Sequence, residues 1–523
     1  MAMLEFALSH HPFAGWTILL VIFVSITGPA VYRQWTHPLR KYPGPWLNSI
    51  SNIPSAIAVF RGVQHLYNYK LHEKYGPIVR TSPNELSFAE PYGAEQIYGF
   101  RHGKALEKSP IFIGIATPVD GCIGIGLSKG AEHQRHRRGM AVGFTKPALV
   151  SQQEILETQI SKLVHVIKTR GKNGNALNMA DWLSFTTFDI IGDICFGESF
   201  HCLDSGVATE WAEATTKVLV TSNLDMAVRR VAGVGTLLNR IALKLMPKEA
   251  MKWRMISFVN AKKRTLERLA DETSDHKDIV YHYQRNKDAR KALSSTELYL
   301  DMMALIVAGS ETTSSLLVSF VWVLSTHRDI HQRLATLIRT TFADPDDITL
   351  QKLEDLVYFD ACIKEALRVF PPVSSSLPRE TPAQGAQIGP FVVPGGTAVS
   401  TSPWASVRSE RNFHLPNEFH PERWLRNNPD EGWDPAFEDD KLSASAPFGA
   451  GPRLCIGQNL AYFEIRLTIA HLLWSFDFEL ETEGVEGEKN RLWSLDPHFG
   501  LLRSFQTLNR PDLYIRFQER AGI

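Results

Sequence analysis

One cysteine, Cys455, stands where a glycine-rich loop meets a run of helical period, and this feature constrains the chain more than any other. The loop, residues 448–457, reads FGAGPRLCIG. Its glycines permit positive φ and close backbone approach, and Pro452 stiffens the turn. The apolar spacing predicts a helix from about Gln458, whose N-terminal amides would point near the sulfur. That helix end, together with Arg453, favours the thiolate.

A thiolate in such a loop is either a nucleophile or a metal ligand. A nucleophile needs a general base, and no histidine near Cys455 in sequence is an obvious one, although a distant histidine could fold back. As a lone axial ligand, a thiolate suits haem iron and promotes O–O cleavage. A buried structural cysteine fits poorly between glycines and beside an arginine. The other four cysteines are too scattered for a disulfide framework or a zinc site, and they suit a reducing compartment.

A long apolar segment with a polar break is the second feature. Residues 296–327 are predicted to form one helix about 32 residues long, or ~48 Å. Ser294 and Glu297 have the spacing of a capping box at its start. The sequence AGSETT, residues 308–313, interrupts the apolar run with a helix-weakening glycine and a glutamate that is costly to bury unpaired. A helix of this length crosses a domain, so a functional interior site is favoured over a chance solvent-facing patch.

The N-terminal region contains an uncharged run, Phe13 to Tyr32, that is long enough to cross a bilayer ~30 Å thick. No Lys or Arg precedes it, whereas Arg33, Arg40 and Lys41 follow, so the positive-inside rule predicts that the rest of the chain is cytosolic. A cleaved signal peptide would have a basic start and a shorter apolar run. The prediction is an anchor and basic flank at residues 1–42, with a transmembrane helix at about 13–32.

The remaining chain, residues 43–523, is predicted to be one large domain, mainly α with small β-sheets (α+β). Helical spacing dominates residues 147–357, whereas a hairpin at 77–88 and strand signals at 391–402 indicate small sheets. Hydrophobic residues make up 44% of the chain and charged residues 21%. Lys+Arg and Asp+Glu both number 56, and this balance argues against a nucleic-acid partner.

Together, these segments resemble the cytochrome P450 family of haem-thiolate monooxygenases, in particular microsomal and fungal members of secondary metabolism. The loop FGAGPRLCIG is similar to the family's haem-binding loop, with Phe448 and Gly457 at expected positions. The resemblance implies that Cys455 is the axial ligand of haem b (iron protoporphyrin IX). It also implies that Arg453 pairs with a haem propionate.

The long helix resembles the family's distal helix, which passes above the iron. The resemblance implies that Glu311 and Thr312 relay protons to bound O₂ as an acid and an alcohol, which is general acid catalysis. It also implies that Ala308 and Gly309 open a groove for O₂. These roles are expectations carried over from the family.

Two further segments match the family. Glu365 and Arg368, three apart on a helix, would by themselves form a surface ion pair worth ~0.2–0.5 kcal/mol. They resemble the family's Glu-x-x-Arg element, and Arg423 in FHPERW resembles its third partner, which implies a structural role for all three. Three other basic residues resemble propionate ligands: His133, Arg137 and Arg379. The family more often has Trp at the position of His133.

The function implied is insertion of one atom of O₂, by hydroxylation or epoxidation, into an apolar small molecule such as a terpenoid or polyketide intermediate. Electrons would come from NADPH through a partner reductase, with cytochrome b5 as a second donor, because no nicotinamide-binding motif is present. The location implied is the endoplasmic reticulum membrane, single-pass. The segment 111–130 is expected to cover the substrate, with hydroxyl contacts from Ser374 to Ser376. The alternatives are rearrangement, dehydration or multi-step oxidation on the same haem, and a non-catalytic haem sensor.

Overall fold

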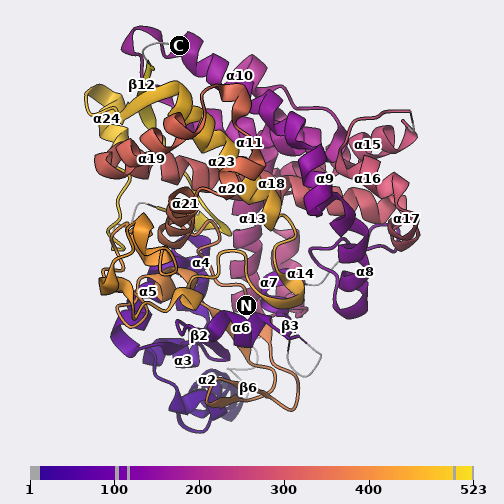
Figure 1. Ribbon diagram of the computed structural model, residues 1–523. Coiled ribbons are helices and arrows are strands. Elements are labelled where there is room, and N and C mark those ends of the chain that lie inside the picture. Colours follow the sequence, from indigo (N-terminus) through magenta and orange to yellow (C-terminus); the bar gives the residue numbers. More distant parts are fainter. Residues whose placement is uncertain (1–11, 101–104, 115–117, 272, 499–501, 521–523) are drawn as a thin grey trace.

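A computed structural model describes residues 12–100, 105–114, 118–271, 273–498 and 502–520. Long helices cross the middle and upper part of the molecule, and most of the short strands lie at the opposite end, near α2 (Figure 1). The predicted α+β class is therefore confirmed for its helix-rich body with small sheets.

The helices fall into three successive groups along the chain. The first group comprises α2 (Pro12–Trp35), α3 (Trp46–Ile50), α4 (Ile53–Phe60), α5 (Gln64–Tyr75), α6 (Gly93–Tyr98), α7 (Pro110–Ile113) and α8 (Gly130–Ala141). The second group comprises α9 (Lys146–Ser151), α10 (Gln153–Arg170), α11 (Met179–Phe196), α12 (Cys202–Ser205), α13 (Glu210–Ala232), α14 (Leu237–Lys244), α15 (Lys248–Ala270), α16 (Ile279–Arg285), α17 (Lys287–Ala292), α18 (Ser295–Thr326), α19 (Arg328–Thr341), α20 (Leu350–Glu354) and α21 (Val357–Val369). The third group comprises α22 (Pro403–Val407), α23 (Gln458–Ser475) and α24 (Gly484–Asn490).

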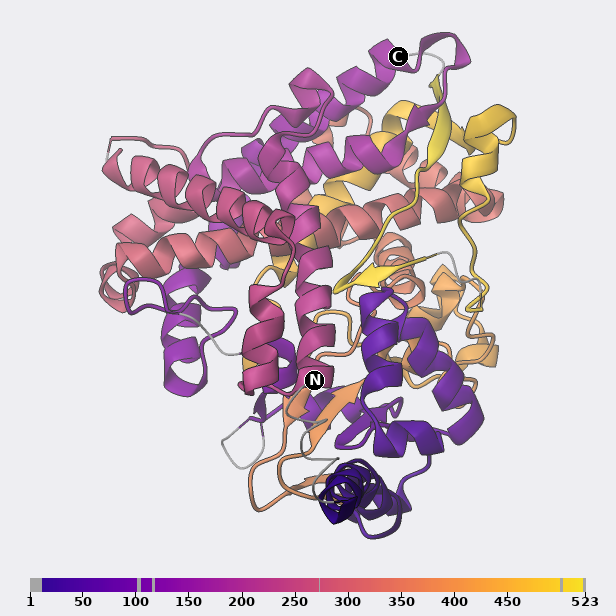
Figure 2. The ribbon, with the colours of Figure 1, turned by 180° about the vertical axis from the view of Figure 1, so that it is seen from behind.

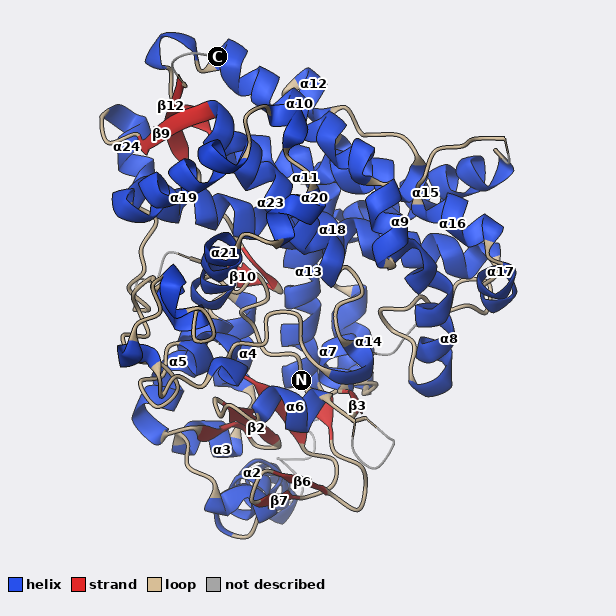
Figure 3. Cartoon of the chain, viewed as in Figure 1, coloured by secondary structure: helices blue, strands red, loops and turns tan. Residues whose placement is uncertain are grey.

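The described strands form four small sheets, drawn in red in Figure 3. The largest has the order β1-β2-β8-β5-β3, and it comprises β1 (Ile78–Ser82), β2 (Glu85–Phe88), β3 (Glu107–Lys108), β5 (Arg379–Glu380) and β8 (Ala398–Thr401). The others pair β4 (Leu177–Asn178), β9 (Phe476–Leu480) and β12 (Tyr514–Glu519); β6 (Ala386–Ile388) and β7 (Phe391–Val393); and β10 (Ser504–Phe505) and β11 (Thr507–Leu508). The predicted hairpin is present, with Ile78 opposite Phe88.

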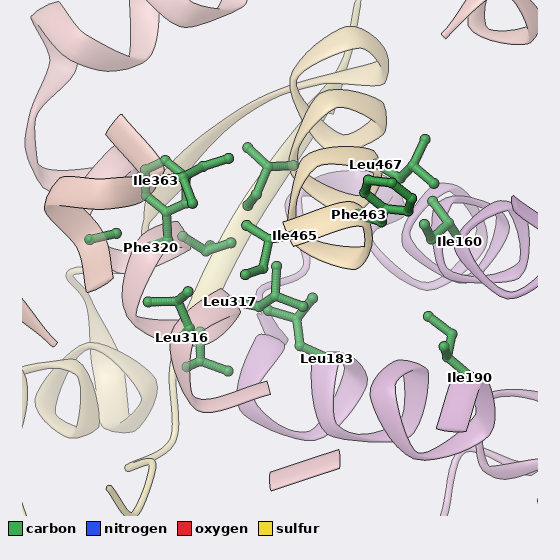
Figure 4. Packing of buried hydrophobic residues seen from close by; sticks show 14 of the residues in the cluster. Ile160, Leu183, Ile190, Leu316, Leu317, Phe320, Ile363, Phe463, Ile465 and Leu467 are labelled. Atoms are coloured by element: carbon green, nitrogen blue, oxygen red, sulfur yellow. The ribbon is translucent and has the colours of Figure 1, made fainter. Parts of the chain in front are cut away.

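Helix α18 runs through the centre of the body without a break, as its sequence predicts. The capping box between Ser294 and Glu297 is confirmed at its start. Its apolar residues pack against α11, α21 and α23, so the core lies around this one helix (Figure 4). Residues from all of these helices meet in that core, among them Leu183, Leu317, Ile363 and Ile465 (Figure 4).

The predicted membrane segment falls within α2, which lies at the strand-rich end of the molecule in both views (Figures 1 and 2). Along this helix, Leu20, Val24 and Val31 are exposed. Among the described helices, α18 is long and apolar enough to cross a membrane, but 72% of its most apolar window is buried, as befits a core helix. A membrane-spanning role for α2 therefore stays a prediction.

Candidate active site

The cysteine loop is shaped by two close approaches of the backbone. Gly451 has a φ of +69°, and a Cβ on it would lie 2.2 Å from the carbonyl oxygen of Tyr98 in α6, so only glycine fits. The amide of Cys455 donates to the carbonyl of Phe448 at 2.9 Å, which closes the loop. Helix α23 then begins at Gln458, as predicted. The loop therefore presents the sulfur at the start of a core helix.

The electrostatics of the sulfur differ from the expectation in two respects. Burial raises the pKa of Cys455, while the backbone N–H of Gly457 and the charge of Arg137 oppose that rise. Arg453, which was expected to act on the sulfur, instead donates to Glu107 at 3.2 Å and to the carbonyl of Ser128 at 2.8 Å. The balance favours a neutral thiol until a metal cation binds and displaces the proton.

A cavity of about 320 Å³ opens in front of this sulfur, between α18 and α23. Most of the predicted site residues line it: Ala308, Thr312, Arg379, Phe448, Arg453, Cys455 and Gly457. Most of its surface is apolar, with Leu305, Val373 and Leu377 among the walls. A larger cavity of about 560 Å³ lies beside Tyr69 and contains none of these residues. The structure thus brings chain segments from 308 to 457 around one apolar space.

Positive charge is concentrated beside this cavity: Arg379 and Arg453 line it, whereas His133 and Arg137 do not. Arg137 donates to the carbonyl of Leu454 at 2.6 Å, and the buried Arg379 donates to that of Leu377 at 3.1 Å. Burial, together with the charge of Arg453, lowers the pKa of His133 to about 4. The same two causes lower the pKa of Arg379.

Lys108, in β3, belongs to the same cluster, and the sequence offered no signal for it. Burial and the charges of Arg453 and Arg379 lower the pKa of its amine to about 7. Among the described residues, Glu107 is the one carboxylate that acts on this group of cations. Such an excess of buried positive charge calls for anions, and two propionates of a haem would supply them.

The distal wall is formed by the polar break in α18. The hydroxyl of Thr312 faces the cavity and donates to the carbonyl of Ala308 at 2.6 Å. Gly309 also lines the cavity, but a Cβ on it would lie 2.7 Å from Ile191 of α11. A larger residue would have to displace the Ile191 side chain, so Gly309 also serves the close packing of α11 on α18. The sequence indicated only its place in the O₂ groove.

Glu311 does not line this cavity. Its buried carboxylate accepts a hydrogen bond from the hydroxyl of Thr216 at 2.7 Å, and it forms an ion pair with Arg510 at 3.1 Å. The high cost of a buried glutamate is thus met by a cation from the C-terminal segment, a partner that the sequence did not indicate. In this arrangement a proton from Glu311 could reach Thr312 only after the carboxylate moved or through water.

The three residues expected to support the fold come together in full burial. Arg368 binds both oxygens of Glu365, at 2.7 and 2.9 Å, and Nε of Arg423 donates to the same carboxylate at 3.1 Å. Trp424 donates to it as well, at 2.8 Å, and Asp440 pairs with Arg423. The network fixes the segment before the cysteine loop against α21.

The serines predicted to contact the substrate have other partners. Ser375 bonds to Ser504 at 2.8 Å, and the amide of Asn68 donates to Ser376 at 3.1 Å. Ser374 is buried, and its hydroxyl has no hydrogen-bond partner among the described residues. None of the three serines lines the cavity, so the structure does not place their hydroxyls at the site.

A thiol facing an apolar cavity, a buried set of cations beside it and a hydroxyl on the opposite wall fit an iron porphyrin bound through sulfur. Fold and site thus define the class of haem-thiolate proteins. The sequence model of the cytochrome P450 family matches residues 42–500, so the chain belongs to that family and is an enzyme of the monooxygenase type.

Several relatives from fungi agree with this assignment. The cytochrome P450 monooxygenase aba2 of Botryotinia fuckeliana is 43% identical over 96% of this chain and 94% of its own. The cytochrome P450 monooxygenase ABA2 of Pyricularia oryzae is 44% identical, over 97% of this chain and 96% of its own. The cytochrome P450 monooxygenase atr2 of Stereocaulon alpinum is 36% identical, with coverages of 88% and 89%. The family implies a haem-thiolate cofactor and an electron donor.

Proposed function

We propose that this protein is a monooxygenase of secondary metabolism that hydroxylates or epoxidises an apolar terpenoid- or polyketide-sized molecule. The observation that carries the proposal is the convergence of Cys455, Thr312 and apolar walls on one cavity. When bound, the haem supplies the activation of O₂ and its transfer to carbon. The apolar walls bind and orient the substrate and exclude water.

The chain's own residues would act at three places around the haem. Cys455 would ligate the iron, and Arg137 together with the N–H of Gly457 would stabilise the charge on its sulfur. His133, Arg137, Arg379, Arg453 and Lys108 would hold the propionates. Thr312 would pass a proton from its hydroxyl into the cavity once that hydroxyl turns away from the carbonyl of Ala308. Glu311 would replenish the proton on Thr312.

Electrons would reach the site from NADPH through a partner reductase, with cytochrome b5 as a second donor. The helix α2 would anchor the protein in the endoplasmic reticulum membrane, with the catalytic domain in the cytosol. The location of the anchor at one end of the molecule supports this arrangement, because it leaves the domain free on one side of a bilayer (Figure 2).

Two experiments test the proposal. The reduced protein with carbon monoxide should show the absorption of a thiolate-ligated haem, and Cys455→His should lose it. Turnover with ¹⁸O₂ in a host that supplies the reductase and candidate terpenoids should place one labelled atom in the product. A rearranged or dehydrated product without label would favour the alternative chemistry. Reduction of the haem by the reductase without any substrate-dependent NADPH oxidation would favour a sensor.

A further inference from the structure

A fully buried histidine lies where α8 meets the start of α18. The Nδ1 of His136 lies 2.7 Å from a carboxylate oxygen of Asp301, and both side chains are excluded from solvent. Nδ1 therefore donates its proton to Asp301, and the lone pair is left on Nε2. This Nε2 is buried and has no hydrogen-bond partner among the described residues. A carboxylate that orients a histidine in this way is the usual support of a metal-binding imidazole.

Two carboxylates lie next to that free nitrogen. Glu297, in the first turn of α18, places Oε1 3.7 Å from Nε2, and Glu132 lies one turn before His136 on α8. One ligand atom from each of the three residues lies within 4.8 Å of the other two. In a tetrahedral zinc site, bonds of about 2.0–2.2 Å place the ligand atoms ~3.4 Å apart. Small side-chain movements would close the gap.

We propose that Glu132, His136 and Glu297 form a binding site for a divalent transition-metal cation, for which Zn²⁺ is the best match. One imidazole and two carboxylates suit Zn²⁺, whereas Mg²⁺ and Ca²⁺ prefer oxygen ligands alone. The two carboxylates neutralise the charge of the cation. Water completes the coordination, because Glu132 is only half-buried. The site lies outside the thiol cavity.

In this structure, the guanidinium of Arg135 occupies the position proposed for the cation. Its guanidinium binds both oxygens of Glu297, one of them at 3.0 Å, and it also donates to the carbonyl of Ala292 at 2.5 Å. The Arg135 side chain is 36% exposed, so it can turn into solvent when a divalent ion takes its place. Zinc and Arg135 therefore compete for Glu297, and removing the arginine should tighten zinc binding.

A bound cation would brace two parts of the active site. Asp301 also accepts a hydrogen bond from the amide of Ile125 at 2.6 Å, so it joins α18 to the segment before α8. Helix α8 itself carries His133 and Arg137, which belong to the group of basic residues beside the thiol cavity. Zinc would thus fix α8 to α18 and raise the thermal stability of the haem-loaded protein.

The test uses tag-free, chelator-treated holoprotein titrated with Zn²⁺, with Mg²⁺ as the comparison ion. Calorimetry should give one zinc per chain, and Tm should rise with Zn²⁺ but not with Mg²⁺. Glu132→Gln should weaken zinc binding at least ~10-fold, because the substitution removes one of three ligands. His136→Gln should abolish it. Arg135→Gln should tighten it several-fold.

The matched control is His201→Gln, which removes an exposed histidine that also pairs with a carboxylate, Asp204. This variant should bind zinc as the wild type does. Equal zinc affinity in wild type and Glu132→Gln would overturn the proposal, as would weaker binding in Arg135→Gln. Because Glu132 is half-buried, its variant should fold even if His136→Gln does not.

Discussion

At the scale of single residues, the site is determined by what each side chain faces. Thr312 faces the cavity, whereas Glu311, its neighbour in sequence, faces Arg510 and Thr216. Successive residues on a helix point about 100° apart, which turns the side chain of Glu311 away from the face of α18 that carries Thr312. The two are therefore expected to contribute differently.

Thr312→Ala should uncouple the enzyme. Without the hydroxyl, proton delivery fails and the product formed per NADPH consumed should fall ~10²-fold, while the thiolate spectrum stays unchanged. Ser314→Ala is the matched control, because its hydroxyl is buried and bonds to a backbone carbonyl of the same helix. Equal coupling in the two variants would contradict the role of Thr312.

Lys108→Met should weaken haem retention. The amine lies among Arg453, Arg379 and His133, and its loss would remove one positive charge that faces the propionates. Haem release to an excess of apomyoglobin should be several-fold faster than in the wild type. Lys364→Gln, at an exposed position on α21, should release haem at the wild-type rate.

The sequence identifies Cys455, Arg453, Arg379 and Thr312 because they stand in short motifs whose composition differs from that of the flanking residues. It does not identify Lys108 or Arg510, because each is an ordinary basic residue that reaches its partners only through tertiary structure. The arginine that acts on the Cys455 sulfur also differs from the one that the sequence indicates. Sequence proximity indicates Arg453, whereas the charge that lowers the pKa of the thiol comes from Arg137, on the distant helix α8. Local patterns thus predict which residues matter better than they predict contacts.

At the scale of elements, a buried ion-pair network joins α21 to the segment before the cysteine loop. Glu365→Gln should be severely destabilising, because Arg368 and Arg423 would remain buried without their carboxylate, at a cost of about 3–5 kcal/mol. Expression should yield little haem-loaded protein. Lys364→Gln on the same helix should cost less than about 0.5 kcal/mol, as measured by chemical unfolding.

A second pair of elements, α11 and α16, is joined by a histidine whose charge depends on pH. The carboxylate of Asp193, 3.0 Å from Nε2, and secondarily that of Asp278, 3.5 Å from Nδ1, raise the pKa of His276 to about 9. Folding therefore favours the protonated ring: its contribution is complete below pH ~6.5, the unfolded value, and is lost as the pH rises through about 9.

Since the His276 side chain is a third exposed, that contribution should amount to about 1–2 kcal/mol. The wild type should be more stable than His276→Gln at pH 6. This difference in the free energy of unfolding, measured in urea, should be smaller at pH 9 by that amount. A difference that did not change with pH would show that the ring is neutral throughout.

The periodic segments allow the longest elements to be predicted. The helix α18, its cap and the hairpin of β1 and β2 follow from local spacing and turn residues. The parallel pairing of β2 with β8 could not be predicted, because it joins segments more than 300 residues apart and depends on the packing of everything between them. The same applies to the approach of α11 to Gly309.

At the scale of the whole molecule, the domain and the anchor should be separable. Deletion of residues 2–32 removes most of α2 but keeps Arg33, whose side chain donates to the carbonyl of Ile50 and whose carbonyl accepts from Arg80. The shortened protein should be released from membranes by alkaline carbonate and keep its carbonyl spectrum, while the full chain should resist extraction. A full chain that carbonate releases would contradict the predicted anchor.

The contact between Gly451 and Tyr98 also has a consequence in time. The turn that carries the thiol packs against the carbonyl oxygen of Tyr98, a residue made early in translation. The turn itself leaves the ribosome late. The iron-binding pocket therefore cannot form until this late turn has been made and has left the ribosome. Porphyrin capture must come late in synthesis or after it, and cells short of haem should accumulate complete but colourless chains.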